Sequence, residues 1–451
     1  MEVCTIGGYD EVGKNMTAVK IGEDVIIIDA GIFLPALVQW QEQERELESN
    51  NPISEKELRR IGALPDDEIL DRLGWRDKVR AIIIGHAHLD HIAALPHIAH
   101  RYPNAKIIGT PFTIEFLETT LRDEKMSLRN QRIRVNENSS YVIKGKSGNY
   151  RAELVHATHS TLQCVFIALH TPEGIFFYTL DFKFDNHPII GEPPNYKRLK
   201  ELGKKGIKVL VADSLYSGTE KRTPSERIAK DLIEDAIGSI HDRKSALIMS
   251  TFSSHIPRLK SIVEFGKRTG REIIFLGRSL DRYVNCAVRV KQCSFRNNIR
   301  IFKYRKQINS FLSKLNKNKG RYLVVCTGHQ AEPGSVLDRI VNDETPLKLS
   351  EGDNVIFSSS IIPTPVNVKD RAEMDKKLKK KGVRIQSDIH VSGHGSREDL
   401  RDLLEMLKPE HLVPAHGEHK LTKPMEELAG ELGYKPGENV HLAFNGKVMK
   451  F

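Results

Sequence analysis

The sequence predicts an α/β layered fold arranged in two successive regions. Short apolar segments that are typical of buried strands alternate with helical patterns up to about residue 213. A second series of alternating helices and strands begins near Thr223. The chain has 451 residues, which is enough for two to three domains of ordinary size.

The first region opens with paired strands over residues 1–35, among them a fully apolar run that ends at Asp29. Residues 36–80 differ in character, with helix-favouring stretches at 39–48 and 66–70, and we interpret them as an insertion over the domain. The later patterns predict strands at 79–85, 106–109, 151–156, 164–170, 175–180 and 208–213, and helices at 92–102 and 111–121.

The second region shows the same alternation of helical and strand patterns. These patterns predict helices at 224–240 and 256–268 and strands at 246–250, 272–276, 322–326 and 354–358. Residues 292–321 and 376–381 are dense in Lys and Arg. Such runs are either solvated faces or surfaces for a polyanion, and the sequence leaves both interpretations open.

The overall composition is that of a soluble globular protein without a membrane segment. No apolar run is long enough for a transmembrane helix, and the N-terminus lacks the pattern of a signal peptide. The five cysteines are scattered and include no Cys-x-x-Cys pair, which indicates free thiols in a reducing cytoplasm. The formal net charge of +10 favours nucleic acid or another polyanion as a partner.

The chemistry is concentrated in one short segment that follows the strand predicted at 79–85, His86-Ala87-His88-Leu89-Asp90-His91. At strand spacing, His86 and His88 point to the same side and can share one ion. Asp90 and His91, where the chain turns towards a helix, can face a second ion close to the first. Imidazole and carboxylate are suitable ligands for zinc, and manganese is an alternative.

This motif resembles the signature of the metallo-β-lactamase superfamily, whose members also have a later His, an Asp and a last His. The resemblance implies that His159, beside Ser160, is the later ligand, with His156 as a rival. It implies that Asp181 bridges two ions and that His416 is the last ligand. Asp185, near Asp181, is expected at the surface. The implied sets are His86, His88, His159 and Asp181 for one zinc, and Asp90, His91, Asp181 and His416 for the other.

The interval between Asp181 and His416 is longer than a simple hydrolase of this fold needs, which implies an inserted domain. This architecture resembles the β-CASP nucleases. Asp213, at a strand end, and the segment His390-Val391-Ser392-Gly393-His394 match further motifs of that group. The implied fold is an αββα sandwich with an inserted α/β domain. The implied divisions are residues 1–214 and 386–451 for the metallo-β-lactamase domain and residues 215–385 for the β-CASP domain.

Within this group the chain is most similar to the RNase J family. The similarity rests on residues 13–16, 179–185, 327–333 and 357–363. It implies a zinc-dependent 5′→3′ exoribonuclease that prefers single-stranded RNA with a 5′-monophosphate, with endonuclease activity also compatible, and a homodimer. Ile92-Ala93-Ala94 stands where the family commonly has a glycine. The chain ends at Phe451, as expected of an archaeal-type form without the bacterial C-terminal domain.

The resemblance also implies roles for the substrate-facing residues. Asp90 orients the nucleophile, and His394, positioned by Asp213, donates a proton to the leaving sugar oxygen or hydrogen-bonds the substrate phosphate. The remaining predicted contacts to the scissile phosphate are His390, Val391, Ser392 and Gly393. A pocket for the terminal phosphate is expected at two polar loops, with charge added by Arg258 and Arg278. These loops are Ser253, Ser254 and His255, and Ser358, Ser359 and Ser360, for which helix capping or a turn is the alternative.

Three other functions are compatible with parts of the sequence. One is an endonuclease of the same fold, like the cleavage and polyadenylation factors. Another is a small-molecule metallo-hydrolase, which the inserted domain and the basic charge disfavour. The third is a non-catalytic RNA-binding protein, which the complete set of expected ligands disfavours.

Overall fold

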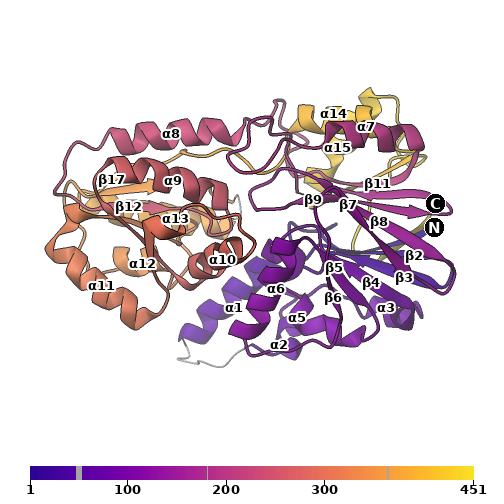
Figure 1. Cartoon of the computed structure of the whole chain (residues 1–451), viewed down its shortest axis with the longest axis horizontal. Coiled ribbons are helices and arrows are strands. Elements are labelled where there is room, and N and C mark those ends of the chain that lie inside the picture. The colour runs from indigo at the N-terminus through magenta and orange to yellow at the C-terminus, as the bar shows by residue number, and fades with distance from the viewer. Residues whose placement is uncertain (47–52, 180, 363–364) are drawn as a thin grey trace. The chain divides into compact units, whose positions relative to one another are not determined.

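The computed structural model describes residues 1–46, 53–179, 181–362 and 365–451, and the chain divides into two compact units. The first unit consists of Met1–Asn186, Pro193–Thr223 and Gly393–Phe451. The second consists of His187–Glu192 and Pro224–Ser392. The first unit is therefore assembled from segments at both ends of the chain, and the colours of Figure 1 show indigo and yellow ribbon within it.

Two mixed sheets form the centre of the first unit. One has the strand order β19-β1-β2-β3-β4-β5-β6 and the other β18-β11-β10-β9-β8-β7. The strands of the first sheet are β1 (Glu2–Gly7), β2 (Met16–Ile21), β3 (Asp24–Ile28), β4 (Val79–Ile83), β5 (Lys106–Gly109), β6 (Arg132–Arg134) and β19 (Lys447–Lys450). Those of the second are β7 (Ser139–Lys144), β8 (Asn149–His156), β9 (Val165–Thr171), β10 (Gly174–Tyr178), β11 (Ile207–Asp213) and β18 (His411–Ala415).

Strand alternation builds two cores in this unit. Leu154 packs with side chains of both sheets, whereas its neighbour Val155 packs with the second sheet and the helices that cover it. Because both faces are covered, these strands are apolar on both sides. The helices of the unit are α1 (Leu34–Glu46), α2 (Glu55–Arg60), α3 (Ile69–Arg72), α4 (Leu89–Ile92), α5 (Leu95–Ile98), α6 (Pro111–Asp123), α7 (Tyr196–Lys205), α14 (Arg397–Leu407) and α15 (His419–Glu431). Figure 1 shows α7, α14 and α15 together on one outer face.

The predicted helix at 92–102 is wrong as a single element. The structure has α4, α5 and a 3-10 turn at Ala99–Arg101 in its place. Pro96 lies at the start of α5, where its missing N–H costs no helical hydrogen bond, so the chain begins a new helix there. In the 36–80 segment, the helix predicted at 39–48 corresponds to α1 as far as Glu46, and residues 47–48 lie outside the described part of the chain.

The second unit is a parallel α/β layer with the strand order β14-β13-β15-β12-β16-β17. Its strands are β12 (Leu247–Ser250), β13 (Glu272–Leu276), β14 (Ile299–Phe302), β15 (Tyr322–Cys326), β16 (Asn354–Phe357) and β17 (Arg384–Gln386). Its helices are α8 (Glu226–Gly238), α9 (Ile256–Arg268), α10 (Arg278–Arg289), α11 (Arg305–Lys317), α12 (Val336–Val341) and α13 (Pro365–Lys380). The predictions for α9, β13 and β15 are confirmed with their bounds.

Because all pairings in this sheet are parallel, the loops that follow its strands meet at one edge. These loops include residues 251–255 after β12, 327–331 after β15 and 358–360 after β16. That edge is where ligands bind in open parallel sheets. Among the described residues, no helix is long and apolar enough to cross a membrane.

Candidate metal centre and active site

The histidine motif lies where the chain leaves the first sheet. Strand β4 ends at Ile83, and His86 follows it in an extended segment. His88 is the N-cap of α4 and keeps extended dihedral angles, and α4 then carries Asp90 and His91. The rings of His86 and His91 nevertheless remain close, with centroids 4.1 Å apart. His86 and His88 belong to one group of possible metal ligands, and Asp90 and His91 belong to another.

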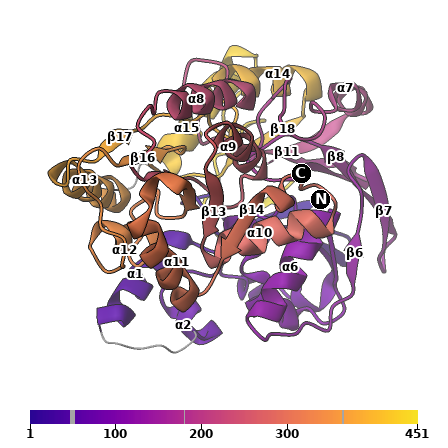
Figure 2. The same ribbon diagram turned by 60° about the vertical axis from the view of Figure 1, so that its left-hand side comes forward.

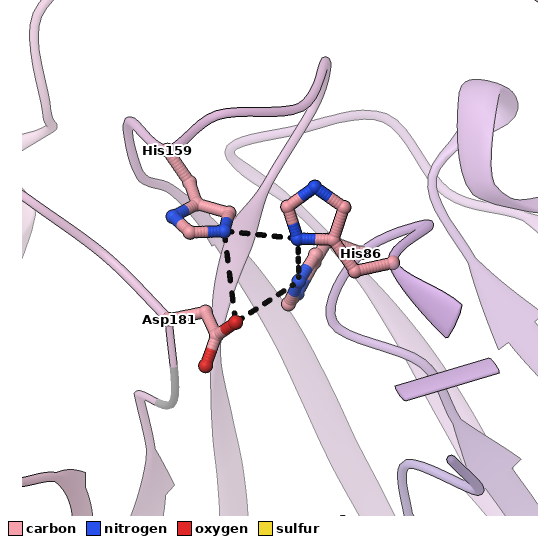
Figure 3. Close-up of side chains that lie close together, drawn as sticks. His86, His159 and Asp181 are labelled. Atoms are coloured by element: carbon pink, nitrogen blue, oxygen red, sulfur yellow. Dashed lines mark hydrogen bonds and ion pairs between the residues drawn. The ribbon is translucent and has the colours of Figure 1, made fainter. Parts of the chain in front are cut away.

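His86, His88, His159 and Asp181 form the first group of possible metal ligands. The Nε2 atom of His86 lies 3.1 Å from Nδ1 of His88 and 3.5 Å from Oδ2 of Asp181. His159 Nε2 lies 3.0 Å from the same His88 atom and 3.6 Å from the same Asp181 oxygen. Figure 3 shows His86, His159 and Asp181 pointing toward one another.

Asp90, His91 and His416 form the second group, and Asp181 contacts two of its members. His91 Nε2 lies 3.5 Å from Oδ2 of Asp90 and 3.2 Å from Oδ2 of Asp181. His416 Nε2 lies 3.5 Å from the other oxygen of Asp181. Asp181 therefore offers one carboxylate to both groups, as a bridging ligand does.

The residues present fit a metal site. Zinc bonds of about 2.0–2.1 Å to imidazole nitrogen require neighbouring ligand atoms about 3.3 Å apart in a tetrahedron, and the separations around His88 and Asp181 range from 3.0 to 3.6 Å. The Oδ1 atom of Asp181 is buried and has no hydrogen-bond partner. A buried carboxylate oxygen without a donor is costly unless a cation faces it. We conclude that this cluster is a metal-binding site.

The protonation states favour ligation at most of these positions. Burial, together with the neighbouring imidazoles, lowers the pKa values of His86, His88 and His159, so these rings are neutral donors. Burial would raise the pKa of Asp181, but the surrounding histidines hold it well below its usual range. For His91, burial lowers the pKa, and the carboxylates of Asp181, Asp90 and Asp29 outweigh that effect and raise it. His91 therefore gives up a proton when it becomes a ligand.

Two residues to which sequence reasoning assigned no role hold the second group in place. His91 donates through Nδ1 to Asp29 Oδ2 at 2.6 Å, and His416 donates through Nδ1 to Asn15 Oδ1 at 3.0 Å. The amide of Asn15 also donates to the backbone carbonyl of Asp90 at 3.0 Å. Such contacts fix the tautomer and the orientation of a ligand ring. Two features of the sequence could have identified these residues. Asp29 ends an apolar strand, and Asn15 belongs to the motif at residues 13–16.

Three residues of this region have left-handed backbone angles. Asp29, Asp181 and His416 have φ values of 59°, 48° and 65°. Each follows the end of a strand, namely β3, β10 or β18. A left-handed backbone conformation turns the chain sharply and is costly for a residue other than glycine. The fold accepts this strain at two candidate ligands, Asp181 and His416, and at Asp29, which contacts the ring of the candidate ligand His91.

The segment 393–395 places a second titratable pair beside the cluster. His394 Nδ1 lies 2.8 Å from Asp213 Oδ2, and its Nε2 atom lies 3.9 Å from Asp181. Burial lowers the pKa of His394, but the carboxylates of Asp181 and Asp213 raise it to about 9. With Asp181 and His416, His394 also forms a third possible ligand group. The predicted pairing of His394 with Asp213 is present in the structure.

Gly393 connects this segment to His159, one of the candidate metal ligands. Its carbonyl oxygen accepts a hydrogen bond from His159 Nδ1 at 2.6 Å. A Cβ atom at this position would lie 2.8 Å from Ser160 Oγ and 3.0 Å from His159 Cε1. Only glycine allows the backbone this close to His159. His390, Val391 and Ser392 belong to the second unit, whereas Gly393 and His394 belong to the first.

The structure also shows where His156 and Asp185 lie. His156 lies outside the cluster and its Nδ1 atom is 2.6 Å from Glu137. The preference for His159 therefore agrees with the geometry. The expectation for Asp185 is wrong, because its side chain is buried and lies 3.5 Å from Nζ of Lys183. The backbone N–H of Asp185 donates to Thr158, which draws it inward beside the ligand-bearing loop.

In the second unit, the loop Ser253-Ser254-His255 precedes α9. His255 is the N-cap of this helix and its Nδ1 atom accepts from the N–H of Arg258. Ser254 is buried and Ser253 is half-buried. Arg258 is fully buried and donates to both oxygens of Glu226, at 2.5 and 2.9 Å. Glu226 therefore neutralises the charge of Arg258 within the fold. The expectation that Arg258 adds positive charge to a terminal-phosphate pocket is wrong.

Ser358, Ser359 and Ser360 follow β16 and differ in their surroundings. Ser358 is buried, accepts from Arg258 at 3.0 Å and donates to the carbonyl of Ile389 at 2.9 Å. Ser360 is exposed. The hydroxyl of Ser359 is buried without a hydrogen-bond partner, and so are both ring nitrogens of His329 in the loop after β15. Arg258 thus connects the serine loop to His390, whose Nδ1 atom lies 3.3 Å from it.

Comparison with known families assigns three parts of the chain. Residues 9–171 match the metallo-beta-lactamase superfamily. Residues 244–371 match the family described as "Ribonuclease J, beta-CASP domain". Residues 382–443 match the family described as "Zn-dependent metallo-hydrolase RNA specificity domain". These matches confirm the predicted fold class.

Similar proteins cover the chain over its full length. It is 40% identical to ribonuclease J of Pyrococcus abyssi, over 100% of this chain and 97% of that protein. It is 39% identical to ribonuclease J of Methanocaldococcus jannaschii, over 100% and 99%, and 31% identical to ribonuclease J 1 of Streptococcus pyogenes, over 99% and 74%. A solved structure of unknown function from Enterococcus faecalis has the same fold, with a TM-score of 0.64, 18% identity and 99% coverage of both chains. The chain belongs to the ribonuclease J family of β-CASP metallo-hydrolases.

Proposed function

We propose that the chain is a zinc-dependent ribonuclease that degrades RNA mainly in the 5′→3′ direction from a 5′-monophosphate end. Family membership supports metal-dependent hydrolysis of RNA. The observation that carries the chemistry is the shared carboxylate of Asp181 between two groups of ligands. This arrangement fits two ions per chain, with zinc as the ion that His-rich ligand sets favour and manganese as the alternative.

The residues of the site divide the work of phosphodiester hydrolysis. Bound zinc would supply Lewis acidity, which makes water a usable nucleophile near neutral pH and offsets charge on the phosphate. Asp90, held by Asn15, orients the attacking water with its partly exposed carboxylate. His394 holds a proton at Nε2 and transfers it to the leaving sugar oxygen. Asp213 keeps that imidazole protonated and correctly turned through its contact with Nδ1.

The loops at the carboxyl edge of the second unit's sheet support recognition of a terminal phosphate. The unpartnered groups of Ser359 and His329 lie in loops that Gln330 connects, since its amide donates to the carbonyl of Ser360 at 2.8 Å. Buried polar groups without partners are expected where a ligand supplies the partner. We therefore assign the terminal-phosphate pocket to residues 253–255 and 358–360, and we place His390, Val391 and Ser392 at the scissile phosphate.

One assay tests both the reaction and its direction. Two RNAs of one sequence, one with a 5′-monophosphate and one with a 5′-hydroxyl, are labelled at the 3′ end and incubated with zinc or manganese. We expect progressive release of mononucleotides, faster from the monophosphate RNA, and none from a His86→Ala protein. Discrete internal fragments that do not depend on the 5′ group would instead indicate an endonuclease of the same fold.

The assembly of the protein is a separate part of the proposal. We propose a homodimer, which rests on the resemblance to the RNase J family and on no contact within this chain. Sedimentation of the full chain at several concentrations measures it directly. A mass equal to one chain of 51.1 kDa at every concentration would contradict it.

A further inference from the structure

An open groove in the second unit lies outside the loops assigned to the terminal phosphate. It has a volume of about 620 Å³ and runs between β14 and α11, from Tyr304 to Tyr322. Among the described strands, β14 lies at the edge of its sheet and pairs with β13 alone. Figure 2 shows β14 and α11 within this unit. Because Tyr304 follows the carboxyl end of β14, the groove begins at the same edge of the sheet as the serine loops.

The charge of this groove is positive throughout. Its lining includes the cations Arg300, Lys306 and Lys314 and contains no carboxylate. Lys306 and Lys314 are exposed. Arg300 lies 3.5 Å from Oε2 of Glu272, whose other oxygen accepts from Arg321 at 2.5 Å. Between Asp281 and Glu332 the sequence contains no acidic residue, so the segment that carries these cations supplies no carboxylate to neutralise them.

Aromatic rings alternate with the cations in the same lining. Tyr304 is 55% exposed, and Phe302, which lines the same groove, is partly buried. The guanidinium of Arg300 lies 5.3 Å from the Phe302 ring, and Nζ of Lys303 lies 5.0 Å from the Tyr304 ring. Phe302 stacks on Phe311, with ring centroids 5.1 Å apart, which holds its ring in place. An exposed tyrosine in a groove that other aromatic rings also line is a surface on which a planar ring can stack.

We propose that this groove binds single-stranded RNA, with phosphates on Arg300, Lys306 and Lys314 and a base on Tyr304. Alternating cations and aromatic rings match the alternation of phosphate and base along a strand, and such surfaces bind single strands without sequence preference. An acidic protein would use the cations but would leave the exposed ring without a stacking partner. The proposal rests on the proposed function, because it takes RNA as the ligand, but it concerns binding rather than cleavage.

Binding is measured by fluorescence anisotropy with a labelled single strand of about 20 nucleotides, enough to span more than one binding segment. Chelator is present so that the RNA stays intact. The test protein is R300Q/K306Q/K314Q, and the control is K200Q/K204Q/K205Q, which removes three exposed lysines from the other unit. We expect roughly tenfold weaker binding by the test protein. Because each neutralised phosphate contributes about 0.7 to the slope of log K against log salt, this slope should become shallower by about 2.

The stacking contact is tested separately with Tyr304→Ala and Tyr304→Phe. A 2-aminopurine base in the RNA should be quenched by the wild-type protein and by Tyr304→Phe but not by Tyr304→Ala, which should bind roughly tenfold more weakly. The proposal would be overturned if the triple variant kept the wild-type affinity for RNA and the wild-type salt slope. It would also be overturned if the triple variant lost binding to a polyglutamate peptide but still bound RNA.

A degradation assay with metal distinguishes this proposal from the proposed function. If the wild-type chain binds RNA through the groove but degrades none, the proposed function fails and the groove stands. If the chain degrades RNA while the groove variants bind it normally, only the groove proposal fails.

Discussion

At the residue scale, the orientation of the second group of ligands depends on hydrogen-bond acceptors that hold the rings of His91 and His416. Asp29 accepts from His91 through one oxygen and from the N–H of Gly85 through the other, at 2.6 and 2.9 Å. Asn15 accepts from His416 and donates to Asp90. Both residues are buried, so their positions are fixed before an ion arrives. The cluster is therefore preorganised by side chains that do not themselves face the ions.

Replacing Asp29 with Asn should weaken metal binding without removing a ligand. The amide still fills the space but no longer supplies a carboxylate acceptor for His91, and loss of such a partner typically costs about 10–100-fold in metal affinity. Zinc affinity is measured by competition with a chelator. Asp67→Asn is the matched control, because Asp67 is also buried in this unit and its side chain accepts from Arg59, Arg101 and Tyr102, none of which is a candidate metal ligand. Equal zinc affinity in the two variants would contradict the role of Asp29.

The His394–Asp213 pair leads to a kinetic prediction. Asp213→Asn and His394→Ala should each lower kcat by about 10²–10⁴-fold, because either change removes a positioned proton donor. Zinc content should stay at the wild-type level, since neither residue belongs to the two main ligand groups. The double variant should be no slower than His394→Ala alone, because Asp213 acts through His394. Loss of zinc in His394→Ala would instead identify this histidine as a ligand.

At the element scale, the sequence predicted the strands better than the turns between them. β13, β15 and α9 were predicted with their bounds because buried parallel strands and amphipathic helices have strong patterns. The helix at 92–102 was not, because Pro96 divides it. Asp185 was misplaced because burial depends on Thr158, a contact from another part of the chain. Asn15 and Asp29 received no role because their partners lie far away in sequence.

The segment 393–395 depends on a close approach of its backbone to His159 and Ser160. Gly393→Ala would place a Cβ atom 2.8 Å from Ser160 Oγ and 3.0 Å from His159 Cε1, so the loop or the ring must move. We expect at least about a tenfold loss of kcat, since a small misplacement near the reacting atoms has a large effect. Gly238→Ala is the control, because a Cβ atom there meets nothing within 4 Å. Wild-type activity in both variants would show that the approach at Gly393 is not needed.

The buried pair of Glu226 and Arg258 fastens α8 and α9 to the serine loop. Arg258→Ala should destabilise the second unit by about 3–5 kcal/mol, because it leaves Glu226 buried without its partner. Urea unfolding followed by circular dichroism measures this change. Arg268→Ala, which removes an exposed pair with Glu234, should cost about 1 kcal/mol or less.

The pair of Glu226 and Arg258 also makes the stability of the second unit depend on pH. Burial alone would raise the pKa of Glu226, but Arg258 and His255 hold it well below its usual value of 4.5. Since the folded-state pKa is depressed, the pair stabilises the unit above pH 4.5, and this contribution is lost as the pH falls toward the folded-state pKa. Glu226→Gln should flatten the dependence of the unfolding midpoint on pH in this acid range. A variant that keeps the wild-type slope would falsify the assignment.

At the scale of the whole molecule, the two units hold different kinds of stabilising interaction. All the candidate metal ligands lie in the first unit, although they come from segments at both ends of the chain. A bound ion therefore joins the N-terminal motif to His416. The second unit contains the Glu226–Arg258 pair and no member of the ligand groups among its described residues. Metal binding should accordingly stabilise one unit and leave the other unchanged.

Scanning calorimetry with and without a chelator tests this division. At a thousandfold excess of free zinc over its dissociation constant, binding stabilises the first unit by about 4 kcal/mol, which corresponds to a shift in Tm of roughly 8–16 °C for a unit of this size. The chelator should therefore move one transition, and His86→Ala should leave that transition insensitive to zinc. Arg258→Ala should move only the other transition. A single transition that both treatments shift equally would show that the two units unfold together, and the metal would then stabilise the whole chain.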